Sequence, residues 1–268
     1  MRVTAIIPAR YASTRFPGKP LVPIAGKPMI LHVAERVDAA RAAGVVDRLI
    51  IATDDSRIVR TVKDAGFEVW ETSASHPTGT DRLAEVAAKL EDDIVCNIQG
   101  DEPLIEAETI EALIRPLRDD PELRMGTLKT ALDRSEDLFD ENRGKVVVDS
   151  RDRALTFTRQ PIIDGVPAEP GYFNRERVEA LHRERAGEGG LTVYSDIGVY
   201  AYRRDFLLQY AALTRTPWEL SERLEQLRAL EHGYEIAVPS VEHRALEVDT
   251  PEDLERVEAA LALELLGS

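Results

Sequence analysis

A short apolar segment that runs directly into a cation-rich loop is the feature that most constrains this chain. Residues 3–7 predict a buried strand, and the loop after it carries Arg10, Arg15 and Lys19 among small residues. Small residues let backbone N–H groups approach an anion, while guanidinium and ammonium groups supply charge-assisted donors. Ligands of α/β proteins bind beyond the carboxyl ends of parallel strands. The pattern therefore predicts a site for the phosphates of a nucleoside triphosphate.

The alternative interpretation is a surface loop whose cations are merely solvated. The strand before the loop and the helical pattern that starts at Pro28 favour the phosphate site. Pro17 and Pro20 restrict the loop, so its donors are partly ordered before a ligand arrives. The glycine spacing matches neither a Walker loop nor a dinucleotide fingerprint.

Apolar periodicity predicts alternating strands and helices through the first half of the chain. This order indicates an α/β fold with a mostly parallel sheet and helices on both of its faces. The strand ends at Pro8-Ala9-Arg10, Thr53-Asp54 and Gln99-Gly100-Asp101 should then meet in one crevice. The predicted strands are 3–8, 48–53, 68–71, 94–98, 125–132, 144–149, 154–158 and 193–202, and the predicted helices are 28–43, 56–65, 80–90, 107–117, 218–231 and 251–265, the last with Thr250 as its cap.

Composition and charge exclude several classes of protein. A chain of 268 residues with 43% hydrophobic and 31% charged residues is typical of a soluble globular protein, not a disordered one. A formal charge of −15 argues against a nucleic-acid surface, so cations must gather locally if an anion binds. No apolar run is as long as a membrane span and the first residues lack a signal-peptide pattern, so we expect no membrane insertion and a cytoplasmic location. Cys96, in an apolar segment, is expected to be a buried strand residue.

A series of motifs, in one order along the chain, resembles a known family. The motifs are Ile-Pro-Ala-Arg-Tyr-Ala-Ser-Thr-Arg-Phe-Pro-Gly-Lys-Pro-Leu at 7–21, then residues 26–30, 52–55, 79–85, 97–103, 224–228 and 248–254. The chain resembles the 3-deoxy-manno-octulosonate cytidylyltransferases, also called CMP-KDO synthetases, over nearly its whole length except about residues 160–195. The resemblance implies a three-layer α/β/α nucleotidyltransferase fold that is Rossmann-like and glycosyltransferase-A-like. We predict a single domain, 1–268, with a CTP-binding half (1–123), a smaller sugar-binding and dimerisation region (124–248) and a closing helix (249–268).

The resemblance also implies a reaction. The anomeric hydroxyl of 3-deoxy-D-manno-octulosonate (KDO), or of a close ulosonic acid, attacks the α-phosphorus of CTP, and pyrophosphate leaves. The CMP-linked product serves lipopolysaccharide or surface polysaccharide synthesis. A Mg²⁺ ion held by Asp101 and Asp249 is implied as cofactor, and a homodimer as the assembly.

Site residues are carried over at the positions that match the family's motifs. Arg82 suits cytosine because a guanidinium donates to its O2 and N3 acceptors, and Arg159 suits a carboxylate because of its planar fork. The expected catalytic residues are Arg10, Lys19, Asp101 and Asp249. CTP is expected at Pro8, Ala9, Arg10, Ser13, Thr14, Arg15, Lys19, Arg82, Gln99 and Asp101, and the sugar acid at Gln99, Arg159, Asp196, Tyr200, Glu225 and Gln226.

Each of these residues also has a structural interpretation. Asp101 would stabilise a turn and Asp249 would assist a helix terminus. Arg82 would lie on a solvated helix face opposite Asp81 and Glu85. Tyr200 would be a core residue of a strand, and Glu225 and Gln226 would lie on the exposed face of a helix. The five histidines, including His76 near the base site, would be helix or loop residues.

One departure from the family's pattern concerns the acceptor. The family usually reads His-Leu-Gly-Ile-Tyr where this chain reads Asp-Ile-Gly-Val-Tyr at 196–200, so an acid replaces a sugar-contacting histidine. A carboxylate near an anionic sugar acid is unfavourable unless it accepts hydrogen bonds from hydroxyls or pairs with an ammonium. The alternatives are therefore an amino-substituted ulosonate such as 8-amino-KDO, another small acid such as a nonulosonate or phosphonate, or a non-catalytic nucleotide-binding protein.

Overall fold

The chain groups into two compact units in the computed structural model, which describes residues 1–12, 16–132, 140, 142–160, 162–163, 166–167, 193–242, 246, 248 and 251–267. Unit 1 consists of Met1–Ile114, Ala201–Ala211 and His243–Ser268, and unit 2 of Arg115–Tyr200 and Ala212–Glu242. Each unit is therefore assembled from separate stretches of sequence. The predicted division of one domain at residues 123 and 248 stays a prediction.

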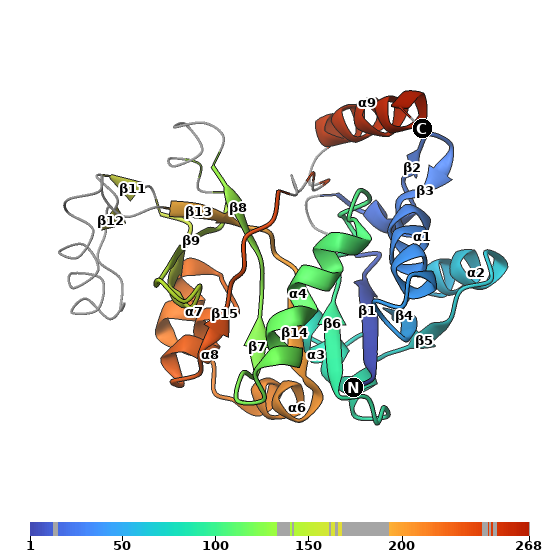
Figure 1. Ribbon diagram of the computed structural model, residues 1–268. Coiled ribbons are helices and arrows are strands. Elements are labelled where there is room, and N and C mark those ends of the chain that lie inside the picture. The colour runs from blue at the N-terminus through green and yellow to red at the C-terminus, as the bar shows by residue number, and fades with distance from the viewer. Residues whose placement is uncertain are drawn as a thin grey trace. The chain divides into compact units, whose positions relative to one another are not determined.

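Unit 1 contains a mostly parallel sheet with the strand order β14-β6-β1-β4-β5 (Figure 1). Its central strand β1 is buried almost throughout and pairs in parallel with both β4 and β6. The register sets Ala9 beside Thr53 and Ile6 beside Asn97, so the three strand ends lie side by side, as predicted. The strands are β1 (Val3–Ala9), β4 (Arg48–Thr53), β5 (Val69–Glu71), β6 (Ile94–Asn97) and β14 (Tyr200–Arg203).

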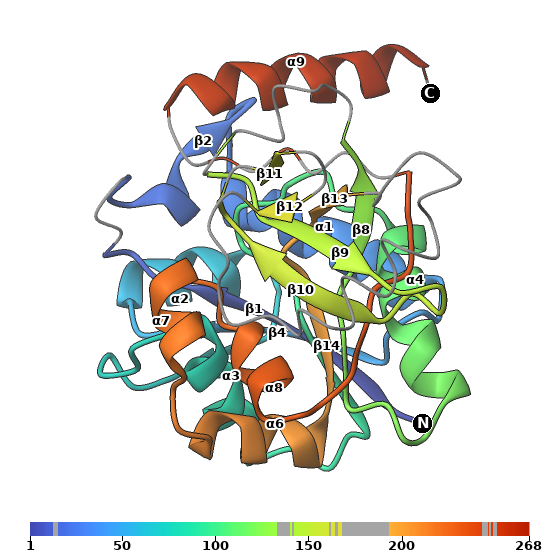
Figure 2. The same ribbon diagram turned by 90° about the vertical axis from the view of Figure 1, so that its left-hand side faces the viewer.

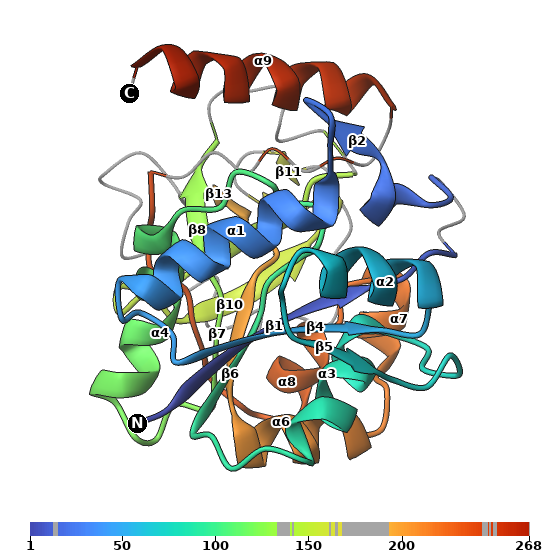
Figure 3. The same cartoon turned by 90° about the vertical axis from the view of Figure 1, so that its right-hand side faces the viewer.

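Helices cover both faces of this sheet. Right-handed crossovers place α1 and α2 on one face and α3 on the other, where α6 also lies (Figure 3). The last helix, α9, packs on a small hairpin through Val257 and its neighbours, and Glu258 accepts the Ala25 N–H at 2.9 Å. The elements are η1 (Lys19–Leu21), β2 (Pro23–Ile24), β3 (Lys27–Pro28), α1 (Met29–Ala42), α2 (Ser56–Asp64), α3 (Gly79–Ala87), α6 (Arg204–Ala212) and α9 (Pro251–Gly267), while α4 (Ala107–Asp119) runs from unit 1 into unit 2.

Unit 2 contains an antiparallel sheet with the strand order β10-β9-β13-β8. The short helices α7 and α8 lie beside its edge strand β10 (Figure 2). A parallel pair, β7 with β15, and a hairpin, β11 with β12, complete the unit. The elements are β7 (Met125–Gly126), β8 (Lys129–Ala131), β9 (Lys145–Val148), β10 (Ala154–Thr158), β11 (Ile162–Ile163), β12 (Val166–Pro167), β13 (Val193–Asp196), α7 (Pro217–Glu222), α8 (Leu227–Glu231) and β15 (Ile236–Ala237).

The α/β fold with a mostly parallel sheet is confirmed, but three predicted elements are wrong in their continuity. The strand 193–202 is broken after Asp196, where Gly198 has a φ of 78°. The helix 218–231 is two helices, because Arg223 takes a left-handed φ of 56° at the end of α7. The strand 125–132 is interrupted between Gly126 and Lys129. Helix α6 and the β2–β3 hairpin had no predicted counterpart.

Two expectations about hydrophobic segments can be compared with the structure. Cys96 lies on β6 and is fully buried, as expected. Within the described residues, no helix is both long and apolar enough to span a membrane.

Candidate active site

The loop after β1 and the turn after β6 bring a cation and an acid together in unit 1. Lys19 begins the short helix η1, and its Nζ lies 2.6 Å from Oδ2 of Asp101. The Asp101 side chain is 27% exposed, so this carboxylate remains partly open to solvent. The main chain next to Asp101 is also fixed, because Val248 donates its N–H to the Asp101 carbonyl at 3.1 Å. Residues 13–15 and Asp249, all predicted site residues, lie outside the described residues.

Gly100 allows the turn after β6 to approach the backbone at the end of β1 closely. A Cβ atom at this position would lie 3.2 Å from the carbonyl oxygen of Pro8 and 3.4 Å from Ile30 Cδ1. The turn after β6 therefore presses against the end of β1. A side chain here would require the two strand ends to move apart by a few tenths of an ångström, so glycine suits this position.

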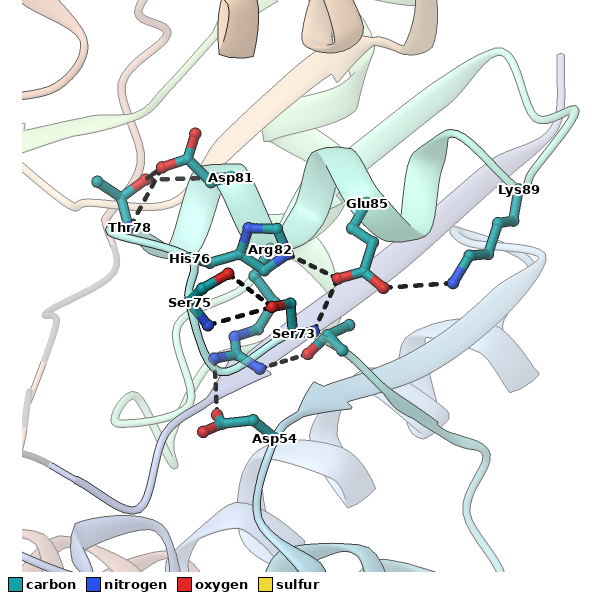
Figure 4. Close-up of polar contacts among 10 residues, drawn as sticks. Asp54, Ser73, Ser75, His76, Thr78, Asp81, Arg82, Glu85 and Lys89 are labelled. Carbon is teal, nitrogen blue, oxygen red and sulfur yellow. Dashed lines mark hydrogen bonds and ion pairs between the residues drawn. The ribbon is translucent and has the colours of Figure 1, made fainter.

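Arg82 is a buried residue of α3 whose guanidinium points back to the strand ends (Figure 4). It is only 1% exposed; Nη2 donates to Asp54 Oδ1 at 2.7 Å, and Nη1 donates to Thr72 Oγ1. Burial lowers the pKa of Arg82, the Asp54 charge opposes that shift, and the nearby Arg10 adds to it. The alternative of a solvated helix face is wrong for this residue.

Two guanidinium donors in this part of unit 1 are buried without a hydrogen-bond partner among the described residues. They are Arg10 Nη2 and Arg82 Nε. The other terminal nitrogen of Arg10 donates to the carbonyl oxygen of Pro77 at 3.1 Å. A buried donor without a partner costs free energy, so these two neighbouring donors indicate a place for an acceptor beyond the described residues.

The loop between β5 and α3 is held by Glu85 (Figure 4). Its carboxylate accepts the Ser73 N–H at 2.9 Å, lies 2.6 Å from His76 Nε2 and contacts Lys89 Nζ at 3.3 Å. These partners, Ser73 first, lower the pKa of Glu85 to about 2. At the other end of the loop, Thr78 forms a capping box with Asp81 that starts α3. Sequence reasoning missed the part that Glu85 plays, and the acid one helical turn after Arg82 was its only signal.

In unit 2, predicted sugar residues meet around the carboxylate of Asp196. Gln226 Nε2 donates to Oδ2 at 2.8 Å and the Tyr200 hydroxyl donates to the same oxygen at 3.1 Å. The Thr127 hydroxyl shares its proton between Oδ1, at 3.1 Å, and the Val199 carbonyl oxygen, at 2.7 Å, and the Gly198 N–H approaches Oδ1 at 3.4 Å. The protein's own hydroxyl and amide groups thus supply the donors that an acid at this position needs.

Burial raises the pKa of Asp196 to about 6, while the hydrogen bonds from Gly198, Thr127 and Tyr200 favour the charged form. The charge of Arg159 acts in the same direction as these hydrogen bonds. The carboxylate is therefore ionised at neutral pH and protonates in mildly acidic solution.

The remaining sugar residues are placed less directly. Arg159 follows β10, and its Nη1 donates to the carbonyl oxygen of Asn142. Gln226 is 3% exposed, so the interpretation of an exposed helix face is wrong for it. Glu225 is half-buried, and Gln99 lies in the turn after β6 in unit 1. Among the described residues, no group of three or more His, Cys, Asp or Glu side chains is arranged to hold a metal ion.

Comparisons with known proteins agree over nearly the whole chain. The model of a family described as cytidylyltransferase matches residues 4–236. A 3-deoxy-manno-octulosonate cytidylyltransferase from Geobacter metallireducens is 49% identical over 257 residues, which cover 96% of each chain. A protein of the same name from Syntrophotalea carbinolica is 50% identical over 261 residues, covering 97% of this chain and 99% of the relative.

Solved structures agree with this result. The structure of a CMP:2-keto-3-deoxy-manno-octonic acid synthetase complexed with CTP has a TM-score of 0.83 at 39% identity and covers 98% of this chain and 100% of its own. The structure of a 4-diphosphocytidyl-2C-methyl-D-erythritol synthase from Anaerococcus prevotii has a TM-score of 0.61 and covers 97% of this chain and 98% of its own. It is 14% identical, so it shows the fold alone. The family resemblance of the motifs is thereby confirmed: this chain belongs to the cytidylyltransferases, within the 3-deoxy-manno-octulosonate cytidylyltransferase family.

Proposed function

We propose that this protein transfers CMP from CTP to the anomeric hydroxyl of KDO and releases pyrophosphate, for lipopolysaccharide or surface polysaccharide synthesis. The observation that carries the proposal is the match, over almost the full chain, to relatives that bear the name of this activity. The geometry of unit 1 supports the nucleotide part of the reaction, and the polar cluster of unit 2 supports the sugar part.

CTP would be held in unit 1 by cations at the carboxyl ends of the parallel strands. Arg10 and Lys19 would bind the phosphates. The two guanidinium donors of Arg10 and Arg82 that have no partner among the described residues support an acceptor-rich ligand here. Arg82 would contribute to cytosine selection through its Nε, since its two terminal nitrogens are engaged by Asp54 and Thr72. The C2 hydroxyl oxygen of the sugar acid would bond to the α-phosphorus as the bond to the leaving pyrophosphate breaks, and the hydroxyl proton is lost to solvent.

A Mg²⁺ requirement is part of the proposal, and the partly exposed carboxylate of Asp101 supports it. Mg²⁺ is commonly held by one or two carboxylates while phosphates and water supply its other oxygens, so a cluster of three protein ligands is not needed. Asp101 is partly exposed and paired with Lys19. Val248, the residue before Asp249, donates its N–H to the carbonyl oxygen of Asp101. Asp101 and Asp249 would hold the ion. When bound, the ion would neutralise charge on the α-phosphate and on the attacking oxygen.

The sugar acid would contact unit 2 through Arg159, Tyr200, Gln226 and Glu225. The guanidinium of Arg159 would pair with the carboxylate of the acid. Tyr200 and Gln226 are already fixed by Asp196, whose charge is compensated by protein donors, so an ammonium on the acceptor is not required. Plain KDO is therefore the preferred acceptor of this proposal. The homodimer and the cytoplasmic location, which the family resemblance implies, belong to it as well.

Pyrophosphate release tests the proposed function. We would measure it with CTP, Mg²⁺ and KDO, and run 8-amino-KDO, sialic acid and UTP in parallel. We expect efficient pyrophosphate release with CTP and KDO. This release should be lost on addition of EDTA and in the Asp101→Asn variant. Release only with another acid would contradict the acceptor, and CTP binding without turnover on any acid would favour a nucleotide-binding protein.

A further inference from the structure

Two buried charged side chains of unit 2, Glu222 and Lys145, have no part in the proposed chemistry. Glu222 ends α7 and is 8% exposed, and Lys145 begins β9 and is fully buried. Burying a charge costs free energy unless hydrogen bonds or an opposite charge compensate it. Both side chains reach the same short segment, the end of β10 at Thr158 and Arg159.

Glu222 holds the N–H side of Arg159. Its Oε2 accepts the backbone N–H of Arg159 at 2.8 Å, and both of its oxygens lie 3.1 Å from the hydroxyl of Thr158, which donates to them. Strand β10 is at the edge of its sheet, and its ladder with β9 ends at the pair Thr158–Lys145. The main chain of Arg159 therefore lies just beyond the strand ladder, and Glu222 replaces the missing partner.

Lys145 holds the carbonyl side of the same residue. Its Nζ donates to the carbonyl oxygens of Arg159 at 3.1 Å, Asp140 at 2.6 Å and Arg143 at 3.0 Å. Arg143 and Asp140 belong to one turn, because the Arg143 N–H donates to the Asp140 carbonyl at 3.3 Å. That turn also contains Asn142, whose carbonyl accepts from the guanidinium of Arg159. Lys145 thus fixes both the main chain of Arg159 and the partner of its side chain.

We propose that Glu222 and Lys145 are positioning residues for the acceptor: they hold Arg159 by both of its peptide groups, so that its guanidinium is ordered before the sugar acid binds. The proposal rests on the proposed function, in which Arg159 binds the carboxylate of the acid. An ordered side chain loses less conformational freedom when it binds, and this lowers the concentration of acceptor that is needed. Neither residue touches the nucleotide half in this proposal, so the KM for CTP should not depend on them.

A matched pair of variants on α7 separates positioning from general stability. Glu222→Gln and Glu219→Gln make the same change at two buried acids of one helix, but Glu219 bonds Arg228 and Arg215 and has no contact with Arg159 in the described structure. We expect Glu222→Gln to raise the KM for KDO about tenfold with the KM for CTP unchanged, because the Arg159 N–H loses a charged hydrogen-bond acceptor. Glu219→Gln should lower the Tm but leave the KM for KDO unchanged.

The decisive measurement is a double-mutant cycle with Arg159→Met. If Glu222 acts through Arg159, Glu222→Gln has no further effect on the KM for KDO in the Arg159→Met background. An equal effect in both backgrounds, or a parallel rise in the KM for CTP, would overturn the proposal. Lys145→Gln, which keeps a hydrogen-bond donor, provides a second cycle with the same expectation if Glu222→Gln does not fold.

The same data distinguish this proposal from the proposed function. Two results test the proposed function alone. They are turnover of KDO by the unsubstituted protein and a weaker affinity for KDO in the Arg159→Met variant. If both hold and the cycle is additive, only the positioning role fails. If the unsubstituted protein does not use KDO, both proposals are overturned.

Discussion

At the scale of single residues, Asp196 has two opposing effects on the protein. Its carboxylate orders Tyr200 and Gln226, yet burial makes the charge costly to keep, as the raised pKa of about 6 indicates. The charge of Arg159 and the hydroxyl group of Tyr200 both favour its ionised form. Asp196 therefore lowers the stability of the folded protein at neutral pH while it fixes the side chains proposed to bind the acceptor.

The raised pKa of Asp196 predicts how the stability of the protein depends on pH. The pKa of Asp196 is raised from 3.8 to about 6 in the folded protein. As pH rises, the unfolded chain therefore loses the Asp196 carboxyl proton at a lower pH than the folded protein does. The contribution of Asp196 to the free energy of unfolding therefore falls as pH rises from about 4 to about 6, by up to about 3 kcal/mol, and stays constant above that range. Asp196→Asn, which cannot ionise, should lack this dependence while its KM for KDO rises.

Urea unfolding of both proteins at several pH values from 4 to 8 checks this prediction. The difference in unfolding free energy between Asp196→Asn and the unsubstituted protein should shift in favour of the variant as pH rises. A constant difference over the whole range would show that the Asp196 carboxyl titrates alike in the folded and unfolded states.

The elements that carry the predicted site residues could be read from sequence much better than the surroundings of those residues. Arg82 lies where its motif predicts, on the helix after β5, but its 1% exposure depends on Asp54 and Thr72, which reach it from separate segments. Gln226 is buried because it meets Asp196, 30 residues earlier in the chain. Periodicity reports one element at a time, so it could not reveal either contact.

At the scale of elements, the contact between β1 and the turn after β6 sets the geometry of the proposed nucleotide site. Gly100→Ala would place a Cβ atom 3.2 Å from the Pro8 carbonyl oxygen, which is backbone and cannot turn aside. We expect a loss of about 1–3 kcal/mol in unfolding free energy and a raised KM for CTP. Thermal unfolding and initial rates with varied CTP measure both effects.

Gly79 provides the matched control for this substitution. A Cβ atom at Gly79 would meet Pro8 Cγ at 3.7 Å, an ordinary contact, in the first turn of α3. Gly79→Ala should therefore be neutral or slightly stabilising. Equal losses in the two variants would mean that the strand-end contact at Gly100 has no special cost.

Elements with a uniform environment could be predicted from sequence, and those interrupted by one backbone angle could not. Strands β1 and β4 are buried along nearly their whole length, and their apolar runs give them clear bounds. The helical pattern after Trp218 continues across Arg223, because its left-handed φ of 56° leaves no mark on the hydrophobic pattern. Helix α6 has mixed faces and follows β14 directly, so no turn signal separates the two.

At the scale of the whole molecule, the C-terminal helix completes the core of unit 1 near the nucleotide end. Val257 is 1% exposed and packs in a cluster with Ile24, Met29, Leu104 and Val248. Leu104 and Val248 are close in sequence to the two acids expected to hold Mg²⁺. Packing of α9 therefore supports the chain on both sides of that proposed site.

Val257→Ala tests this support, with Leu263→Ala on the same helix as its control. The buried substitution should cost about 2 kcal/mol of unfolding free energy through lost packing and a cavity, and should raise the KM for CTP. Leu263 is 70% exposed, so its substitution should change stability by less than about 0.5 kcal/mol. Similar Tm values for the two variants would contradict the packing role of α9.

The central claim is that this protein forms a phosphodiester between CMP and KDO, and ³¹P NMR of the complete reaction tests it most directly. Purified protein with CTP, Mg²⁺ and KDO should convert the three CTP resonances into one phosphodiester resonance and one pyrophosphate resonance in equal molar amounts. The product should not form without KDO. Unchanged CTP resonances in the presence of KDO, or release of pyrophosphate together with free CMP and no phosphodiester, would contradict the account.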